Sequence, residues 1–410
     1  MRIGLSEHSE SRRGLVPLPI VVAVGACLTM IVVPVSAPRT AAQARFAALP
    51  LQSPAPAGNP ATPERVALGR LLFWDPILSG QRDVACATCH HPDFGYSDGL
   101  DLSIGTNGAG LGAARTFVPG QPARLVKRNS QTVLNVAFNG LTSGADAAPA
   151  AAPMFWDLRV RSLEAQALEP IKALEEMRGD AYPEHRAVPS AVARLNAIAG
   201  YRELFARAFG GNRPVNEQNL GRALAAFQRT LIAVNSPFDR YMRGDTNALS
   251  PEELRGMERF ESTGCVNCHS GPMFSDFAVH VLAVPDNQKL PESDSGVNKA
   301  YGFRTPSLRN LTATAPYMHN GVFSSLPEVI QFYQRVSRGG GRRGGQGGPR
   351  GLNAQVGPDQ IDPLARRLNM RGRGQGDLIA FLRALDDPGF DRTVPERVPS
   401  GLSVGGTLVR

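Results

Sequence analysis

The stretch CATCHHPDFGYSDG, residues 86–99, decides the fold, because it opens with two cysteines and a histidine in one short string. A second string, CVNCHSG, carries Cys265, Cys268 and His269 in the same order. Apart from Cys27, the two strings contain every cysteine of the chain. Three kinds of site use a Cys-x-x-Cys pair: a structural zinc site, a redox-active disulfide and a covalent haem attachment.

The details of the two strings favour one of these three alternatives. A zinc site does not need a histidine directly after the second thiol in both copies, and the copies lie far apart in the chain. A thioredoxin-like disulfide is expected beside a βαβ unit, which the sequence does not indicate. Haem attachment uses every position, since two thiols bind the vinyl groups and the histidine ligates the iron. We therefore predict two haem c groups, attached at Cys86, Cys89 and His90 and at Cys265, Cys268 and His269.

Each string follows a predicted helix of the same design. TPERVALGRLLFWD starts at Thr62 and SPEELRGMERF starts at Ser250, each a good N-cap followed by proline. Both segments contain Gly-x-x-x-Phe, beginning at Gly69 and at Gly256, and a small residue one turn from an aromatic one lets another helix pack closely. The repetition indicates an internal duplication of a helix–haem–helix unit.

The expected partner helices are LGRALAAFQRTLI (220–232) and GDLIAFLRALDD (376–387), which both have apolar residues at helical spacing. Strand patterns are sparse. The predicted fold class is mainly α, with two cytochrome c-like helical domains that each bind one haem c covalently.

Composition and charge exclude some functions. The chain has 410 residues, of which 42% are hydrophobic and 20% charged, as is typical of a globular protein. The formal net charge is +8, but arginines in residues 1–44 and in the Gly/Arg-rich stretch 338–351 account for most of it. The small net charge of the rest of the chain does not require a basic binding face, so we expect no nucleic-acid partner. The stretch 338–351 is expected to be a flexible surface loop.

The N-terminus has the features of an export signal. Arg12 and Arg13 precede a mostly apolar run at 14–37, and the small-x-small pattern AQA follows at 42–44. The alternative is a retained anchor helix, since about 20 apolar residues can span a bilayer. We predict a periplasmic protein, anchored in the membrane if this segment is retained.

Five further stretches carry a resemblance to a known family. They are RNSQTVLNVAFN (128–139), FWDLRVRSLEAQALEPI (155–171), EEM (175–177), NSPFDRYMRGD (235–245) and RTPSLRNLTATAPYMHNG (304–321). Together with the two haem strings they resemble the bacterial dihaem cytochrome c peroxidases and their MauG-type relatives, in order and in spacing. The resemblance implies this division: 1–44 signal peptide or anchor, 45–235 peroxidatic haem c domain, 236–390 electron-transfer haem c domain, 391–410 tail.

The resemblance also implies a role for individual residues. The haem on His90 resembles the peroxidatic site, and the haem on His269 resembles the site of electron entry. Trp156 matches a tryptophan placed between the haems, and Gln166 and Glu176 match a polar pair above the peroxide site, with Glu176 as acid–base. Taken alone, Glu176 also fits a solvated helix charge, and Trp156 a core anchor. Oxygens for a calcium ion are implied at Asn129, Thr314 and Pro316.

Two positions depart from the peroxidase pattern. Where such peroxidases place a capping histidine after the string SIG, this chain has Thr106, so we expect the first iron to be open as made. Where they place a methionine downstream of His319, this chain has Tyr333, as in the MauG-type arrangement. We predict Tyr333 as the distal ligand of the second haem, the alternative being Met318, and His319 as a hydrogen-bonding neighbour. Three other histidines are expected to be surface or structural: His91, His185 and His280.

Three functions fit these features. The first is a periplasmic dihaem oxidoreductase that reduces hydrogen peroxide with electrons from a small cytochrome c or a cupredoxin. The second is a MauG-type enzyme that oxidises a protein substrate by way of a high-valent dihaem state, and Thr106 and Tyr333 favour it. The third is a non-enzymatic dihaem electron carrier, against which the spacing of Gln166 and Glu176 argues. Members of the family often form homodimers, although the sequence identifies no interface.

Overall fold

Helices joined by long irregular segments make up most of the regular structure, as the sequence predicts. The structure, a computed structural model, describes residues 45–142, 147–338, 351–370 and 374–408. The helices are α1 Pro63–Trp74, α2 Cys86–Cys89, α3 Leu163–Gln166, α4 Glu169–Lys172, α5 Ala187–Ala197, α6 Ala199–Phe209, α7 Glu217–Gln228, α8 Pro237–Met242, α9 Pro251–Ser262, α10 Leu326–Ser337, α11 Pro363–Arg366 and α12 Gln375–Arg383. The described strands form three antiparallel pairs: β1 Gly108–Ala109 with β2 Thr116–Phe117, β3 Pro153–Met154 with β4 Val160–Arg161, and β5 Val279–Val281 with β6 Gly302–Arg304.

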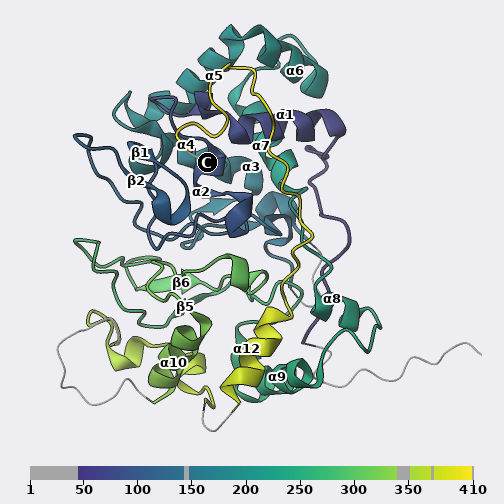
Figure 1. Ribbon diagram of the computed structural model, residues 1–410, viewed down its shortest axis with the longest axis vertical. Helices are drawn as coiled ribbons and strands as arrows, with labels where there is room; N and C mark the ends of the chain where they lie inside the picture. The colour runs from purple at the N-terminus through teal and green to yellow at the C-terminus, as the bar shows by residue number, and fades with distance from the viewer. Residues whose placement is uncertain (1–44, 143–146, 339–350, 371–373, 409–410) are drawn as a thin grey trace, which may run out of the picture. The chain divides into compact units, whose positions relative to one another are not determined.

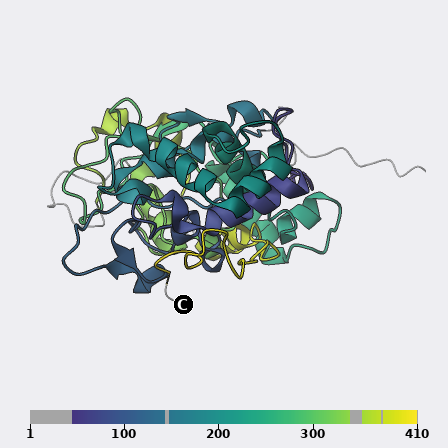
Figure 2. The ribbon, with the colours of Figure 1, turned by 90° about the horizontal axis from the view of Figure 1, so that it is seen from above.

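Helix α1, which precedes the first haem string, packs directly against α7, and the two lie side by side in Figures 1 and 2. A Cβ at Gly69 would lie 2.0 Å from the carbonyl oxygen of Ala223, so only glycine permits this approach. Phe73, one turn further, meets Phe227 edge to face with ring centroids 5.2 Å apart. The predicted close packing of this helix and its predicted partner are both confirmed.

Helix α9, which precedes the second string, packs against α12 in the same way. A Cβ at Gly256 would lie 2.0 Å from the carbonyl oxygen of Asp377. Phe260 and Phe381 face each other edge to face at 5.4 Å. The same pairing therefore stands before both haem strings, as the internal duplication predicts.

The starts of these two helices follow from their capping residues. Thr62 and Ser250 each accept a backbone hydrogen bond from the first turn, and Pro63 and Pro251 occupy the first helical position. At α9 the cap is reciprocal, since Glu253 Oε2 accepts a hydrogen bond from the Ser250 amide at 2.7 Å. Such caps satisfy amides that have no partner inside the helix.

Each helix pair builds a hydrophobic cluster, and the segment after α12 joins the first cluster, although it follows the second in sequence. Phe390 and Val398 pack among the residues around α1 and α7. Arg70 of α1 pairs with Asp391 at 2.5 Å, and the Gly405 amide donates to the Trp74 carbonyl at 2.8 Å. Figure 1 shows this segment in yellow, running from α12 past α1.

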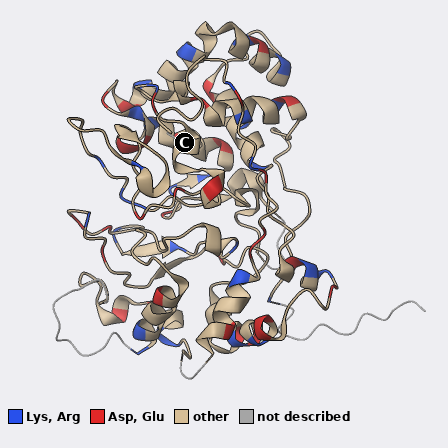
Figure 3. Cartoon of the chain, in the orientation of Figure 1, with Lys and Arg blue, Asp and Glu red and all other residues tan. Residues whose placement is uncertain are grey.

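Two segments for which the sequence makes predictions lie wholly or mostly outside the residues that the structure describes. The predicted signal or anchor at 1–44 and nearly all of the loop at 338–351 lie outside the described ranges. Within those ranges, no helix combines the length and the apolar composition needed to cross a membrane. Basic and acidic residues are intermingled along the described chain (Figure 3).

Candidate functional site

The first Cys-x-x-Cys-His string forms one helical turn, α2, which carries Cys86 and Cys89 and ends at His90. The His90 amide donates to the Cys86 carbonyl at 3.0 Å, which closes the turn. The His90 ring contacts the carbonyl oxygen of Tyr96 through Nδ1 at 3.1 Å. Because a carbonyl only accepts, the ring donates through Nδ1 and its Nε2 keeps a free lone pair. The turn therefore presents two thiols and one ligating nitrogen.

The second string repeats this arrangement. Cys265 begins a short turn, and the His269 amide donates to the Cys265 carbonyl at 2.9 Å. His269 Nδ1 contacts the carbonyl oxygen of Phe274 at 2.9 Å, so its Nε2 is also left to act as a ligand. A carbonyl that fixes the tautomer of a ligating histidine is a common supporting contact at metal centres.

Burial tunes the ionisation of these residues. It raises the pKa of the Cys86 thiol to about 12 and raises the pKa of Cys89 as well. It lowers the pKa of His90 to about 4 and also lowers that of His269. Both imidazoles are therefore neutral at neutral pH, which is the form that binds iron.

One cavity reaches both strings. Its volume is about 580 Å³, and its wall includes Cys89, His90, Cys265, Cys268 and His269. Apolar side chains from several elements line much of the rest. Among the described residues, the four thiols do not converge on one cluster of metal-ligand distance, as a shared zinc site would require. Two separate thiol pairs, two neutral imidazoles and an apolar cavity fit two covalently attached haems.

Glu176 and Gln166 lie beside the first string, as the sequence predicts for a polar pair. Gln166 ends α3, and Glu176 belongs to a π-helical turn, η6 (Leu174–Arg178). Both line the main cavity together with His90, and both line a second pocket of about 50 Å³ next to Cys86. Burial, and then the charge of Glu175, raises the pKa of Glu176 to about 7. Glu176 can therefore gain or lose a proton near neutral pH.

The loop that carries Thr106 packs against the turn that carries Glu176. The Thr106 amide donates to the Glu175 carbonyl at 3.3 Å. A Cβ at Gly105 would lie 2.3 Å from the Glu175 carbonyl oxygen and 2.4 Å from that of Glu176. Buried Arg115 donates to the Gly105 carbonyl at 2.7 Å. These contacts fix the loop against η6.

Trp156 is buried in the cavity wall and is held from two sides. Its Nε1 donates to the carbonyl of Asn129 at 3.1 Å, and its own carbonyl accepts from the Arg304 amide at 2.8 Å. The Asn129 amide donates to the His319 carbonyl at 2.8 Å. The position of the indole is therefore set jointly by segments from before and after it in the chain.

Tyr333 and Met318 both line the cavity and pack in one hydrophobic cluster, and Tyr333 also packs in the cluster that contains Cys265. Tyr333 lies on α10, and burial raises the pKa of its hydroxyl. Buried His319 stacks on Phe303 with ring centroids 3.7 Å apart, and burial lowers its pKa to about 3. The geometry thus brings both candidate distal ligands to one place and makes His319 a stacked, neutral neighbour.

The three residues expected to bind calcium also lie in this cavity wall. The Asn129 amide side chain donates to the Leu100 carbonyl at 2.8 Å, while the Asn129 carbonyl accepts from Trp156. Thr314 Oγ1 donates to the Leu311 carbonyl at 3.4 Å, and Pro316 follows two residues later. A calcium ion at these oxygens stays a prediction.

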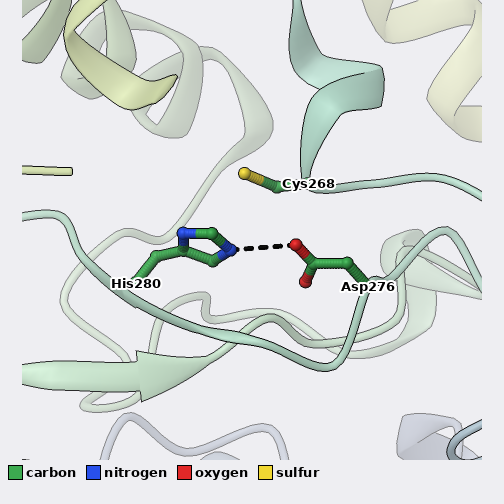
Figure 4. A group of neighbouring side chains, drawn as sticks. All are labelled: Cys268, Asp276 and His280. Carbon is green, nitrogen blue, oxygen red and sulfur yellow. Dashed lines mark hydrogen bonds and ion pairs between the residues drawn. The ribbon is translucent and has the colours of Figure 1, made fainter. Parts of the chain in front are cut away.

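Cys268, Asp276 and His280 form a further cluster of ligand-type side chains (Figure 4). His280 Nε2 lies 2.9 Å from Asp276, and Nδ1 lies 2.7 Å from Asp362. The hydrogen bond to Asp276, followed by those to Cys268 and Asp362, raises the pKa of His280 to about 11. Both ring nitrogens of His280 face carboxylates and the thiol belongs to the haem string, so the contacts that His280 makes with Asp276 and Asp362 are ion pairs.

The other two histidines differ in exposure. His185 is exposed. His91 is buried, accepts a hydrogen bond from the Asp93 amide at 3.2 Å, and packs edge to face on Trp74 at 5.6 Å. Both placements are compatible with the surface or structural roles expected of them.

An arginine network next to Trp156 in the chain is not among the features predicted from the sequence. Arg128 pairs with Asp157 at 2.6 Å and with Asp294 at 2.6 Å, and its guanidinium lies 5.5 Å from the Phe303 ring centroid. Arg128 precedes Asn129 and Asp157 follows Trp156, so both lie next to predicted site residues, and this proximity in the sequence could have indicated them. No local pattern points to Asp294, because it comes from a distant loop.

The family model for di-haem cytochrome c peroxidase matches residues 63–247. Relatives match over more of the chain. The methylamine utilization protein MauG of Methylorubrum extorquens is 36% identical over 363 residues, covering 87% of each chain. The cytochrome c551 peroxidase of Pseudomonas aeruginosa is 30% identical, covering 80% of this chain and 84% of its own.

Solved structures agree with this assignment. The crystal structure of a MauG-like protein associated with microbial copper homeostasis superposes with a TM-score of 0.65 at 26% identity, covering 83% of this chain and 95% of its own. The fold, the two haem strings and these similarities together identify the chain: it belongs to the di-haem cytochrome c peroxidase family of haem-containing peroxidases, which includes the MauG-type oxidoreductases.

Proposed function

We propose that this chain binds two haem c groups and reduces hydrogen peroxide at the first of them. The observation that carries the proposal is the cavity wall that Glu176 and Gln166 share with His90. The residues that would hold the haems are Cys86, Cys89 and His90 for the first and Cys265, Cys268 and His269 for the second. Bound haem supplies an iron that exchanges single electrons and activates the O–O bond of peroxide.

Glu176 is the acid–base group of this proposal. With a pKa of about 7, it is a carboxylate in a large fraction of molecules at neutral pH. It takes a proton from the incoming hydrogen peroxide and returns a proton to the oxygen that leaves as water. A general acid–base works best when its pKa is close to the working pH.

Gln166 orients the substrate next to Glu176. Its amide both donates and accepts hydrogen bonds, so it can hold the two oxygens of peroxide in one direction. Arg115, Gly105 and Thr106 keep the loop packed on the turn of Glu176, which holds the backbone that carries the carboxylate. Thr106 provides no imidazole to compete with peroxide.

Trp156 connects the two sites for electron transfer. It lines the cavity that both strings share, and its hydrogen bonds to Asn129 and Arg304 hold the ring in one place. A fixed aromatic ring shortens the distance that an electron must cross in one step. Electrons enter at the second haem from a small cytochrome c or a cupredoxin.

The proposal also includes the domain division, the export of the chain and a calcium ion. Residues 45–235 and 236–390 form the two haem-binding parts, while the tail from residue 391 packs on the first part through Asp391 and Val398. The N-terminal 44 residues direct export to the periplasm. Asn129, Thr314 and Pro316, which all line the cavity, would supply oxygens to a calcium ion.

A second candidate function is the oxidation of a protein substrate, as in the MauG-type branch of the family. Tyr333 favours it, because this tyrosine lines the cavity and packs in the same hydrophobic cluster as Cys265 of the second string. An anionic, hard tyrosinate ligand stabilises the ferric and higher states of iron, whereas a methionine thioether raises the reduction potential. The substrate would then be a protein.

Steady-state oxidation of reduced cytochrome c, with hydrogen peroxide as the acceptor, tests the first function. Sustained turnover that is lost in Glu176→Gln supports peroxide reduction. A single oxidation event without turnover, in a protein that contains both haems, supports the second function instead.

A further inference from the structure

Arg304 is a buried guanidinium at the end of β6, with 5% of its surface exposed. Its Nε donates to the Phe155 carbonyl at 2.9 Å, and its Nη atoms donate to the Thr305 carbonyl at 3.4 Å and to Gln131 Oε1 at 3.2 Å. Every one of these hydrogen-bond partners is neutral. The side chain also lines the cavity that both haem strings share.

The other buried arginines of the described chain each have an acidic group nearby. Arg229 pairs with Glu164 at 2.7 Å, and Arg309 pairs with Asp239 at 2.8 Å. Arg115 donates to backbone carbonyls, and Asp83 and Asp98 act on it electrostatically.

Arg304 differs from these three arginines, because burial lowers its pKa to about 10 and no acidic group raises it. A buried charge without a counter-charge is strongly unfavourable, so such a group is expected to face an anion. The guanidinium contacts the carbonyls of Phe155 and Thr305, the amide oxygen of Gln131 and the ring of Phe277, and none of these groups carries a negative charge. The counter-charge must therefore come from something that occupies the cavity. The planar fork of an arginine matches a carboxylate, with which it forms two parallel hydrogen bonds.

We propose that Arg304 binds a propionate carboxylate of one of the two covalently attached haems. Haem carries two propionates, and its thioether links to either string place it in the cavity that Arg304 lines. The same residue joins the Trp156 carbonyl through its amide. Arg304 thus ties the carboxylate edge of a haem to the segment that holds the tryptophan. The proposal rests on haem attachment at the two strings and does not depend on the peroxidase activity.

The test measures the midpoint potentials of both haems in the purified holoprotein, by a redox titration followed by EPR. In Arg304→Gln, one haem is expected to shift to a lower potential, because loss of the positive charge leaves the propionate anion unbalanced and favours ferric iron. Arg304→Lys keeps the charge, so the midpoint potential of that haem is expected to stay close to the wild-type value. The ferric EPR signal whose midpoint potential shifts identifies whether the propionate belongs to the haem on His90 or to the haem on His269.

Arg309→Gln is the matched control, since Arg309 is also buried but pairs with Asp239. It is expected to lower stability and to leave both potentials unchanged. Unchanged potentials in Arg304→Gln, or equal shifts in the two glutamine variants, overturn the proposal. The haem content of the wild-type protein is measured first, so failure of haem attachment is distinguished from failure of the propionate contact.

If Arg304→Gln does not fold, infrared spectroscopy of holoprotein with ¹³C-labelled propionates decides the question. Lysine is a point charge and cannot form the two parallel bonds of arginine. The carboxylate bands of one propionate are therefore expected to differ between the wild-type protein and Arg304→Lys. Identical bands in the two proteins overturn the proposal.

Discussion

Gly69 of α1 lies so close to Ala223 of α7 that a Cβ on the glycine would sit 2.0 Å from the alanine carbonyl oxygen. Gly256 of α9 stands in the same relation, at the same 2.0 Å, to Asp377 of α12. Each glycine therefore sets the distance between the helix that leads into a haem string and the partner helix.

Replacing either glycine by alanine is expected to destabilise the protein. In Gly69→Ala or Gly256→Ala the new methyl group must displace a backbone carbonyl, and overpacking of this kind costs about 1–3 kcal/mol. Alanine is intrinsically a better helix former than glycine by about 1 kcal/mol, so any loss is due to the contact. The free energy of unfolding in urea measures the effect.

Gly200→Ala is the control for this prediction. Gly200 also lies in a helix, α6, but its Cβ would meet only Pro399 at an ordinary 3.5 Å. We expect this variant to be as stable as the wild-type protein or slightly more stable. Equal stability of all three variants would show that the two close helix contacts do not limit the fold.

This pair of contacts was predictable from the sequence because both partners obey local rules. Short windows of sequence show the capping residues Thr62 and Ser250, and they show Gly69 and Gly256, each one turn before a phenylalanine. The amphipathic partner helices are equally visible in short windows. The haem strings were predictable for the same reason, since the attachment chemistry fixes their spacing.

Other parts of the site depend on contacts between distant segments and could not be predicted locally. Asp294 reaches Arg128 from a separate loop, and Arg304 holds the segment of Trp156 from β6. The return of Asp391 and Gly405 to α1 is equally invisible in the sequence, because that segment is irregular and has no periodic pattern.

Loss of the Glu176 carboxylate is expected to reduce peroxide turnover. Glu176→Gln keeps the size of the side chain but cannot accept a proton, and general acid–base catalysis is worth about 10²–10⁴-fold. Stopped-flow kinetics of peroxide reduction measures the loss. Glu203→Gln, at an exposed position on α6, is the control and is expected to leave the rate unchanged. Wild-type rates in Glu176→Gln would assign proton transfer to another group.

The pH dependence of kcat/KM is expected to report the pKa of Glu176, about 7. The carboxylate form accepts the proton of peroxide, so kcat/KM rises with pH up to about 7 and is level above it. Glu175 contributes to the raised pKa of Glu176. In Glu175→Gln the loss of that negative charge lowers the pKa of Glu176, so the acidic limb moves to lower pH. A limb that stays in place, or moves to higher pH, contradicts this assignment.

The ligand of the second haem is expected to depend on Tyr333 and not on Met318. Both side chains line the cavity and pack in one hydrophobic cluster, so geometry alone admits either. In Tyr333→Phe the low-spin EPR signal of the oxidised protein is expected to change to that of a different ligand set. Met318→Leu is the matched control and is expected to retain the wild-type signal. The reverse pattern makes Met318 the ligand.

The coordination of the first iron tests the central claim most directly. A peroxidase that binds peroxide without prior reduction needs an open coordination position on that iron. Thr106 stands where a capping histidine is expected, and its amide is held by Glu175. Low-temperature EPR of the fully oxidised holoprotein, before any reductant is added, measures the coordination. We predict one high-spin ferric signal and one low-spin ferric signal in equal amounts. Two low-spin signals would contradict the claim, since they would show that a side chain of this chain occupies the position at which peroxide must bind.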